Sequence, residues 1–64
     1  MNRQLNKRLK FALIDREMKQ RELARAAGMG EATLSLIING VYVPSTEQQT
    51  TIARILNKSP GDLF

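Results

Sequence analysis

Apolar residues recur every three or four positions near the start of the chain. Leu5, Leu9 and Leu13 fall on one face of a helix, and the charged residues around them lie largely outside that face. This spacing predicts a first amphipathic helix over residues 3–16.

Two further helical segments follow, with a very short connection between them. Residues 20–27 are rich in alanine and stop at Gly28, which suits the left-handed C-cap of a helix. Residues 31–39 form a second apolar segment that stops at Gly40. Two short helices joined by a turn that contains glycine are typical of a helix-turn-helix motif.

The next stretch predicts a connector and then a fourth helix. Residues 41–43 look strand-like but are closed by Pro44, so we expect an extended connector. Ser45 and Gln48 have the spacing of a capping box, in which each side chain bonds the other residue's backbone N–H. The apolar residues that follow predict a helix that continues to Asn57.

A similar start signal is found near the end of the chain. Ser59 stands at an N-cap position, Pro60 at the first helical position and Asp62 at the third. We therefore expect a fifth, short helical turn. The fold class predicted for the single domain over residues 1–64 is all-α, a compact arrangement of five helices.

Composition excludes several kinds of chemistry. The 64 residues are 42% hydrophobic and 25% charged, as in ordinary globular proteins, and include no cysteine and no histidine. The carboxylates are scattered singly, so neither an enzyme nor a metal or other cofactor is predicted. No apolar run approaches the ~20 residues of a membrane span. We expect a soluble, cytoplasmic protein with no membrane partner and no small-molecule substrate.

Positive charge is concentrated in the first part of the chain. Ten basic and six acidic residues give a net charge of +4, and residues 1–27 hold eight of the basic residues and three of the acidic ones. Such a basic half favours a polyanionic partner, either nucleic acid or an anionic membrane surface. A solvated helix face is the alternative. Membrane binding is less favoured because Phe11 alone would supply an aromatic anchor.

Residues 20–37 meet the packing demands of a tight pair of helices. Ala24 is small where the two helices cross, and Gly28 stands at the turn. The inward positions are all apolar: Leu23, Ala27, Met29, Leu34 and Ile37. A helical hairpin that binds no DNA would satisfy the same pattern, but the basic half of the chain favours DNA binding.

These residues resemble the lambda repressor/Cro-like, or Xre-type, helix-turn-helix domains. The resemblance covers residues 9–64 and rests on residues 20–30, 34–40, 44–45, 52–56 and 59–63. It implies a five-helix lambda-repressor-like domain that binds operator DNA, commonly as a dimer, with the helix-turn-helix at the second and third helices.

The chain departs from this family at several positions. Many members carry an arginine in place of Leu13 and a glutamate in place of Ile38, and these pair across the domain. We expect Leu13 and Ile38 to pack directly instead, since hydrophobic residues can replace an ion pair. Lys19 is a poor N-cap. Thr46 and Gln49 stand where apolar residues are usual, so they thin the core or face a partner.

The third helix has one face that is free to read bases. Leu34, Ile37 and Ile38 cluster toward the core, and recognition helices present their N-terminal residues to the major groove. The candidate base-reading residues are Glu31, Ala32, Thr33 and Leu36. Two alternatives stay open: Glu31 suits a helix N-terminus by charge alone, and Ala32 with Leu36 would also suit an apolar protein-binding patch.

Phosphate contacts are expected from the flanks of the motif. Gln20 combines a side-chain amide with the free N–H groups of a helix start, and the family resemblance places both Gln20 and Asn39 at the DNA backbone. The candidate phosphate-contacting residues are Lys19, Gln20, Arg21, Ser35, Asn39 and Tyr42. The alternative for Tyr42 is a ring half-buried under the fourth helix.

The predicted function is sequence-specific binding of double-stranded DNA by a transcriptional regulator, with residues 31–39 in the major groove. The alternative is a protein-interaction module on the same fold, such as an antitoxin-like partner or a component of an assembly. A homodimer would use the fourth helix, the fifth helix or Phe64. RNA binding is a weaker option because the chain has three aromatic residues, too few for a stacking platform.

Overall fold

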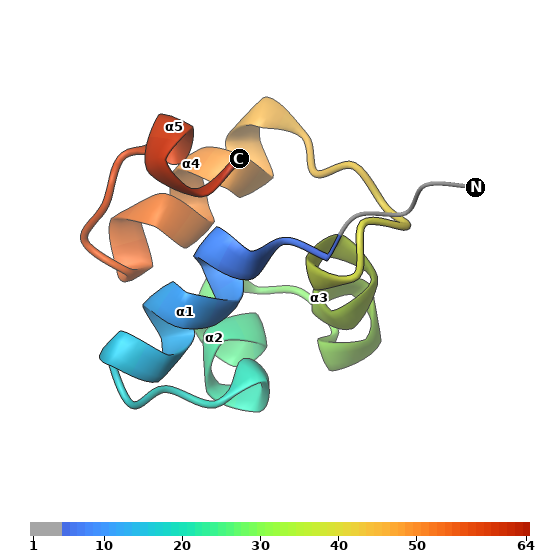
Figure 1. The fold of residues 1–64 in the computed structure, drawn as a ribbon. Coiled ribbons are helices and arrows are strands. Elements are labelled where there is room, and N and C mark those ends of the chain that lie inside the picture. The colour runs from blue at the N-terminus through green and yellow to red at the C-terminus, as the bar shows by residue number, and fades with distance from the viewer. Residues whose placement is uncertain (1–4) are drawn as a thin grey trace.

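The computed structural model describes residues 5–64, and this part of the chain contains five α-helices and no strand. The helices are α1 (Lys7–Asp15), α2 (Gln20–Ala27), α3 (Glu31–Ile38), α4 (Thr46–Ile55) and α5 (Pro60–Leu63). Figure 1 shows α3 at one side of the molecule, and α4 and α5 above α1 and α2. The predicted all-α fold of five helices is confirmed.

The first helix begins later than its apolar spacing predicted. Residues 3 and 4 lie outside the described part of the chain, but Leu5 and Asn6 are not helical. Asn6 is the N-cap, and its side chain accepts a hydrogen bond from the backbone N–H of Leu9 at 3.0 Å. This cap makes the helix begin at Lys7, so Leu5 lies outside it and is 39% exposed instead of continuing the buried stripe.

Both short helices of the predicted helix-turn-helix are present. Gly28 has φ 73° and caps α2 in the left-handed conformation, as predicted. Lys19 is the N-cap of α2, and its own side chain carries no acceptor. The Glu22 carboxylate accepts from the Lys19 backbone N–H at 2.8 Å and supplies half of a capping box. The third helix ends at Ile38, and Asn39 is its C-cap.

The start of α4 follows the predicted capping box. Ser45 Oγ accepts from the Gln48 N–H at 3.1 Å, and Gln48 Oε1 accepts from the Ser45 N–H at 2.8 Å. The end of α4 was predicted too far along the chain. The helix stops at Ile55, because Leu56 is the C-cap and Asn57 takes a left-handed φ of 59°, which asparagine tolerates.

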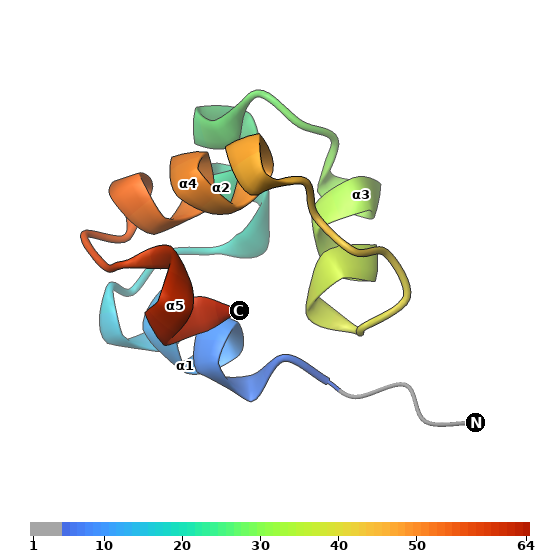
Figure 2. The same cartoon turned by 90° about the horizontal axis from the view of Figure 1, so that it is seen from above.

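The last helix, α5, begins with Pro60 at its first position, as predicted. The N-cap residue is Ser59, and its backbone N–H donates to Asp62 Oδ2 at 3.2 Å. Figure 2 shows α5 beside α1, and these two helices pack together, as do α4 and α2. The last helix, α5, thereby packs against the first helix, α1.

Every helix contributes to one hydrophobic core. Its buried residues are Leu9, Ala12, Leu13, Leu23, Ala24, Leu34, Ile37, Ile38, Ile52, Ala53, Leu56 and Leu63. None of the charged or polar side chains in residues 5–64 is buried. Leu13 and Ile38 are 4% and 2% exposed and belong to this core. Both side chains are therefore buried, as they must be if an apolar contact replaces the ion pair of other family members. That the two side chains touch each other stays a prediction.

Candidate nucleic-acid interface

The predicted recognition helix, α3, divides its side chains between the core and the surface. Its buried residues, Leu34, Ile37 and Ile38, hold it against the domain. The predicted base-reading residues lie on the remaining surface: Glu31 and Ala32 are exposed, Thr33 is half-buried and Leu36 is 44% exposed. Gly30 precedes them in extended backbone and has no side chain to shield the N-terminal turn of α3.

The start of α2 supplies a second surface segment. Lys19 and Arg21 are exposed, and Gln20 is half-buried. These three residues lie together because they are consecutive around the helix start, where the first N–H groups have no carbonyl four residues earlier. The nearby Glu22 carboxylate is committed to the Lys19 N–H. Its negative charge opposes an incoming phosphate, so Lys19 and Arg21 must supply the positive field there.

The C-terminal turn of α3 brings together two of the predicted phosphate-contacting residues. Asn39 Nδ2 donates to Ser35 Oγ at 3.4 Å, a long hydrogen bond on the surface. The bond orients the Asn39 amide along the helix. Such a weak bond is readily exchanged for one to a charged oxygen, because hydrogen bonds to charged groups are the stronger ones.

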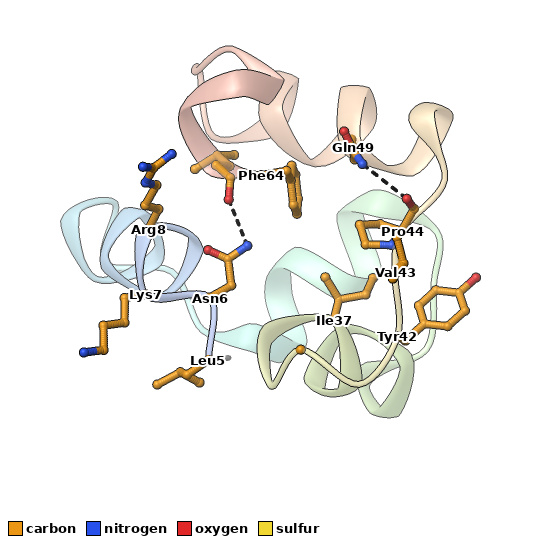
Figure 3. A pocket seen from close by; sticks show the side chains of 12 residues that line it. Leu5, Asn6, Lys7, Arg8, Ile37, Tyr42, Val43, Pro44, Gln49 and Phe64 are labelled. Carbon is orange, nitrogen blue, oxygen red and sulfur yellow. Dashed lines mark hydrogen bonds between the residues drawn. The ribbon is translucent and has the colours of Figure 1, made fainter. Parts of the chain in front are cut away.

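The connector after α3 folds back onto that helix. The backbone N–H groups of Val41 and Tyr42 both donate to the Leu36 carbonyl, at 2.9 and 3.2 Å. Tyr42 is 42% exposed, so more than half of this residue is covered, and the alternative of a half-buried ring stays open. Figure 3 shows this ring projecting away from the neighbouring hollow. Its hydroxyl is therefore available to a partner beside α3.

That hollow, of about 770 Å³, lies beside the C-terminal end of α3 and is bordered by the starts of α1 and α4 and by the end of α5. It is lined by Leu5, Asn6, Lys7, Arg8, Ile37, Gly40, Tyr42, Val43, Pro44, Gln49, Leu63 and Phe64. Gln49 Nε2 donates to the Pro44 carbonyl at 3.3 Å, as Figure 3 shows. The polar residue at position 49 therefore holds the connector against α4, while Thr46 is exposed.

The sequence patterns did not identify two residues that lie near this surface. Asn6 was assigned to the interior of the first helix, although asparagine is a favoured N-cap and would have signalled a later start. Val43 is 81% exposed and is the most exposed large apolar residue of the described chain. No local pattern marks Val43, because a short apolar run before proline is also compatible with burial.

Other kinds of site were sought in the same part of the chain. Among residues 5–64, no three His, Cys, Asp or Glu side chains are grouped so as to hold a metal ion. No helix in the described range has both the length and the apolar character required to cross a membrane.

Comparison with protein families decides the kind of domain. The sequence profile of the Cro/C1-type HTH DNA-binding domain matches residues 8–64, which include all five helices apart from Lys7. The chain belongs to the Cro/C1-type HTH family. Its helix-turn-helix is therefore α2 and α3, and the surface described above lies on the motif that defines a DNA-binding domain.

A phage protein is among the relatives of this Cro/C1-type domain. The ImmF control region 10 kDa protein of Bacillus phage phi105 is 44% identical over 43 residues. The match covers 67% of this chain and 48% of the phage protein. The chain thus spans about half the length of that curated relative.

Solved structures share the fold over almost the whole chain. The clp gene regulator ClgR of Corynebacterium glutamicum has a TM-score of 0.85 at 26% identity, covering 91% of this chain and 62% of its own. The restriction-modification controller protein C.AhdI of Aeromonas hydrophila has a TM-score of 0.85 at 22% identity, and the match covers 92% of this chain and 89% of C.AhdI. The DNA-binding domain of the P22 c2 repressor has a TM-score of 0.85 at 23% identity, and the match covers 98% of this chain and 84% of that domain. The last two likenesses establish the fold alone.

Proposed function

We propose that this Cro/C1-type domain binds double-stranded DNA sequence-specifically, as the DNA-binding part of a transcriptional regulator, with α3 in the major groove. The observation that carries the proposal is the division of α3. One face is buried in the core, and the N-terminal turn and Leu36 are open to solvent. A recognition helix needs this combination, because it must be fixed to the domain while its outer side chains reach base edges.

The open face of α3 supplies few groups, but each suits a base edge. Ala32, Leu36 and the Thr33 methyl would touch thymine methyl groups. The Thr33 hydroxyl would hydrogen-bond a base, and Glu31 would accept from the N4 amine of cytosine. The proposed base-reading residues remain Glu31, Ala32, Thr33 and Leu36.

Phosphate contacts would come from both sides of α3. Lys19, Gln20 and Arg21 would bind one strand's backbone at the start of α2, where the helix dipole also favours an anion. Ser35, Asn39 and Tyr42 would bind phosphate at the far end of α3. The exposed Asn39 amide and Tyr42 ring support this assignment.

The regulator would act as a homodimer on DNA. A single small module has a limited contact area, and helix-turn-helix dimers read half-sites about one helical turn apart. The contact between copies would be made through α4, α5 or Phe64. The Phe64 side chain lines the hollow beside α3 and is half-buried, so it has apolar surface left to cover.

One observation favours a second candidate function. Ala32 and Leu36 are both exposed on α3 and together make a small apolar patch. A protein-interaction module on the same fold would use this patch against another protein. Such an interface would be nearly insensitive to salt, whereas phosphate binding releases counterions.

Salt dependence therefore tests the proposal. A fluorescence-anisotropy titration with a random-sequence duplex would be repeated at three salt concentrations. A domain that neutralises ~5 phosphates should show a log–log slope of about −4 to −5 for its association constant. No binding at the lowest salt concentration, or binding with a flat salt dependence, would contradict DNA binding.

A further inference from the structure

Asn6 lies where the beginning of the chain, the recognition helix and the last helix meet. Its side chain makes two hydrogen bonds: Oδ1 accepts from the Leu9 N–H at 3.0 Å, and Nδ2 donates to the Leu63 carbonyl at 2.8 Å. The second bond joins residues that are 57 positions apart. Figure 3 shows it as the dashed line between α1 and α5.

The backbone of Asn6 makes the contact that bears on DNA binding. Its N–H donates to the Ile38 carbonyl at 2.7 Å, one of the shortest backbone hydrogen bonds outside the helices. Ile38 is the last residue of α3, and Asn39 follows it directly. The terminal carbonyls of a helix have no partner within the helix, so Asn6 satisfies one that would otherwise need water.

The two side-chain bonds hold the Asn6 backbone in place for this contact. Asn6 is not in a helix, with φ −81° and ψ 87°, so no regular structure fixes its N–H. The bond to Leu9 ties Asn6 to α1, and the bond to Leu63 ties it to the end of α5. With both made, the N–H of Asn6 has a fixed direction toward the Ile38 carbonyl.

We propose that Asn6 is a positioning residue for DNA binding, which sets the C-terminal turn of α3 so that Asn39 meets a phosphate. The proposal rests on the proposed function, because Asn39 acts only if α3 binds DNA. Asn6 would act through Ile38 and Asn39, because its side-chain amide bonds Leu9 and Leu63 within the fold.

Three variants separate positioning from general stability. Asn6→Ala removes both side-chain bonds. Asn6→Asp keeps an acceptor for the Leu9 N–H but loses the donor to the Leu63 carbonyl. Ala53→Gly is the control: it removes a buried methyl group from α4, a helix that carries neither Asn6 nor the last turn of α3, and it weakens the fold. Circular dichroism at low temperature would select conditions in which all variants are folded.

The first readout needs no DNA. The amide groups of Asn39, Gly40 and Val41 donate to carbonyls within the last turn of α3, so their hydrogen exchange reports on that turn. Asn6→Ala should speed their exchange about tenfold more than that of the α2 amides, and Asn6→Asp should have an intermediate effect. Ala53→Gly should change both sets alike. If Asn6→Ala also changes both sets alike, the positioning role is wrong.

The second readout is a double-mutant cycle on binding to the random duplex. Asn39→Ala and Asn6→Ala should each weaken binding, by about tenfold and about fivefold, and the double variant should be no weaker than Asn39→Ala alone. The proposal would be overturned if the loss of affinity in the double variant equalled the product of the two single losses. It would also be overturned if Asn6→Ala bound DNA as the wild type does. If the wild type itself does not bind, the proposed function fails, while the hydrogen-exchange test of the turn still stands.

Discussion

At the scale of single residues, the proposed interface depends on a few cations placed beside polar groups. Lys19 and Arg21 are exposed at the start of α2, and the carboxylate of the exposed Glu22 accepts from the Lys19 backbone N–H. A phosphate bound there would meet a helix N-terminus and two positive side chains. These long-range forces supply affinity without sequence information, so their loss should be visible with any duplex.

Arg21→Ala should weaken binding to a random duplex and should reduce the steepness of its salt dependence by about one unit. Arg16→Ala is the matched control, since Arg16 is an exposed arginine at the C-cap of α1 and carries no proposed contact with phosphate or with a second copy. Anisotropy titrations of both variants over the same salt range would measure the two slopes. Equal slopes for the two variants would remove Arg21 from the interface.

At the scale of elements, the helices are set mainly by their ends. Ser45 with Gln48 starts α4, and Gly28 ends α2, and both were predicted because cap residues act on neighbours three or four positions away. The start of α1 was predicted wrongly because the prediction followed the apolar spacing and overlooked a cap residue. Leu5 continues the helical spacing, but the Asn6 cap outweighs that spacing.

Gly28→Ala should lower the free energy of unfolding by about 1–2 kcal/mol, because a side chain is strained at the φ of 73° that ends α2. No neighbouring atom lies within 4 Å of an added Cβ, so the cost comes from the backbone conformation and not from a clash. Urea unfolding followed by circular dichroism would measure it.

Gly61→Ala provides the opposite case. Gly61 lies in α5 without a positive φ, and an added Cβ there also meets nothing within 4 Å. Alanine is favoured over glycine in a helix, so this change should leave stability unaltered or raise it by up to about 1 kcal/mol. A variant at position 61 that loses as much stability as Gly28→Ala would show that the strain argument is wrong.

At the scale of the whole molecule, the core joins all five helices and carries no buried charge within residues 5–64. The sequence predicted most of the apolar residues of this core and the open face of α3, because both follow from helical periodicity. Of the residues predicted to face inward, Ala27 and Met29 are half-buried against the core, and Leu5 is exposed. It did not predict the hydrogen bond between Asn6 and Leu63, which joins the two ends of the fold. A bond across 57 positions leaves no local pattern. The exposure of Tyr42 likewise depends on how the connector folds back onto Leu36.

The apolar pair proposed at Leu13 and Ile38 can be tested by restoring charges. Leu13→Arg alone should destabilise the domain by about 3–5 kcal/mol, since it buries an unpaired charge. The double variant with Ile38→Glu should recover much of that loss if the two side chains meet across α1 and α3. Urea unfolding of both variants would decide this. A double variant less stable than Leu13→Arg would place the two residues out of contact.

The central claim is that α3 and its flanks form the DNA-binding face. An NMR titration tests it most directly, with a duplex too short to hold two copies of the domain, so that no contact between copies adds shifts of its own. Amide shifts of the ¹⁵N-labelled domain would be followed at low salt. The account predicts that the largest changes fall on residues 19–21, on Glu31 to Asn39 and on Tyr42, with little change in α5. Shifts centred on α4 and α5, or no shifts at all, would contradict it.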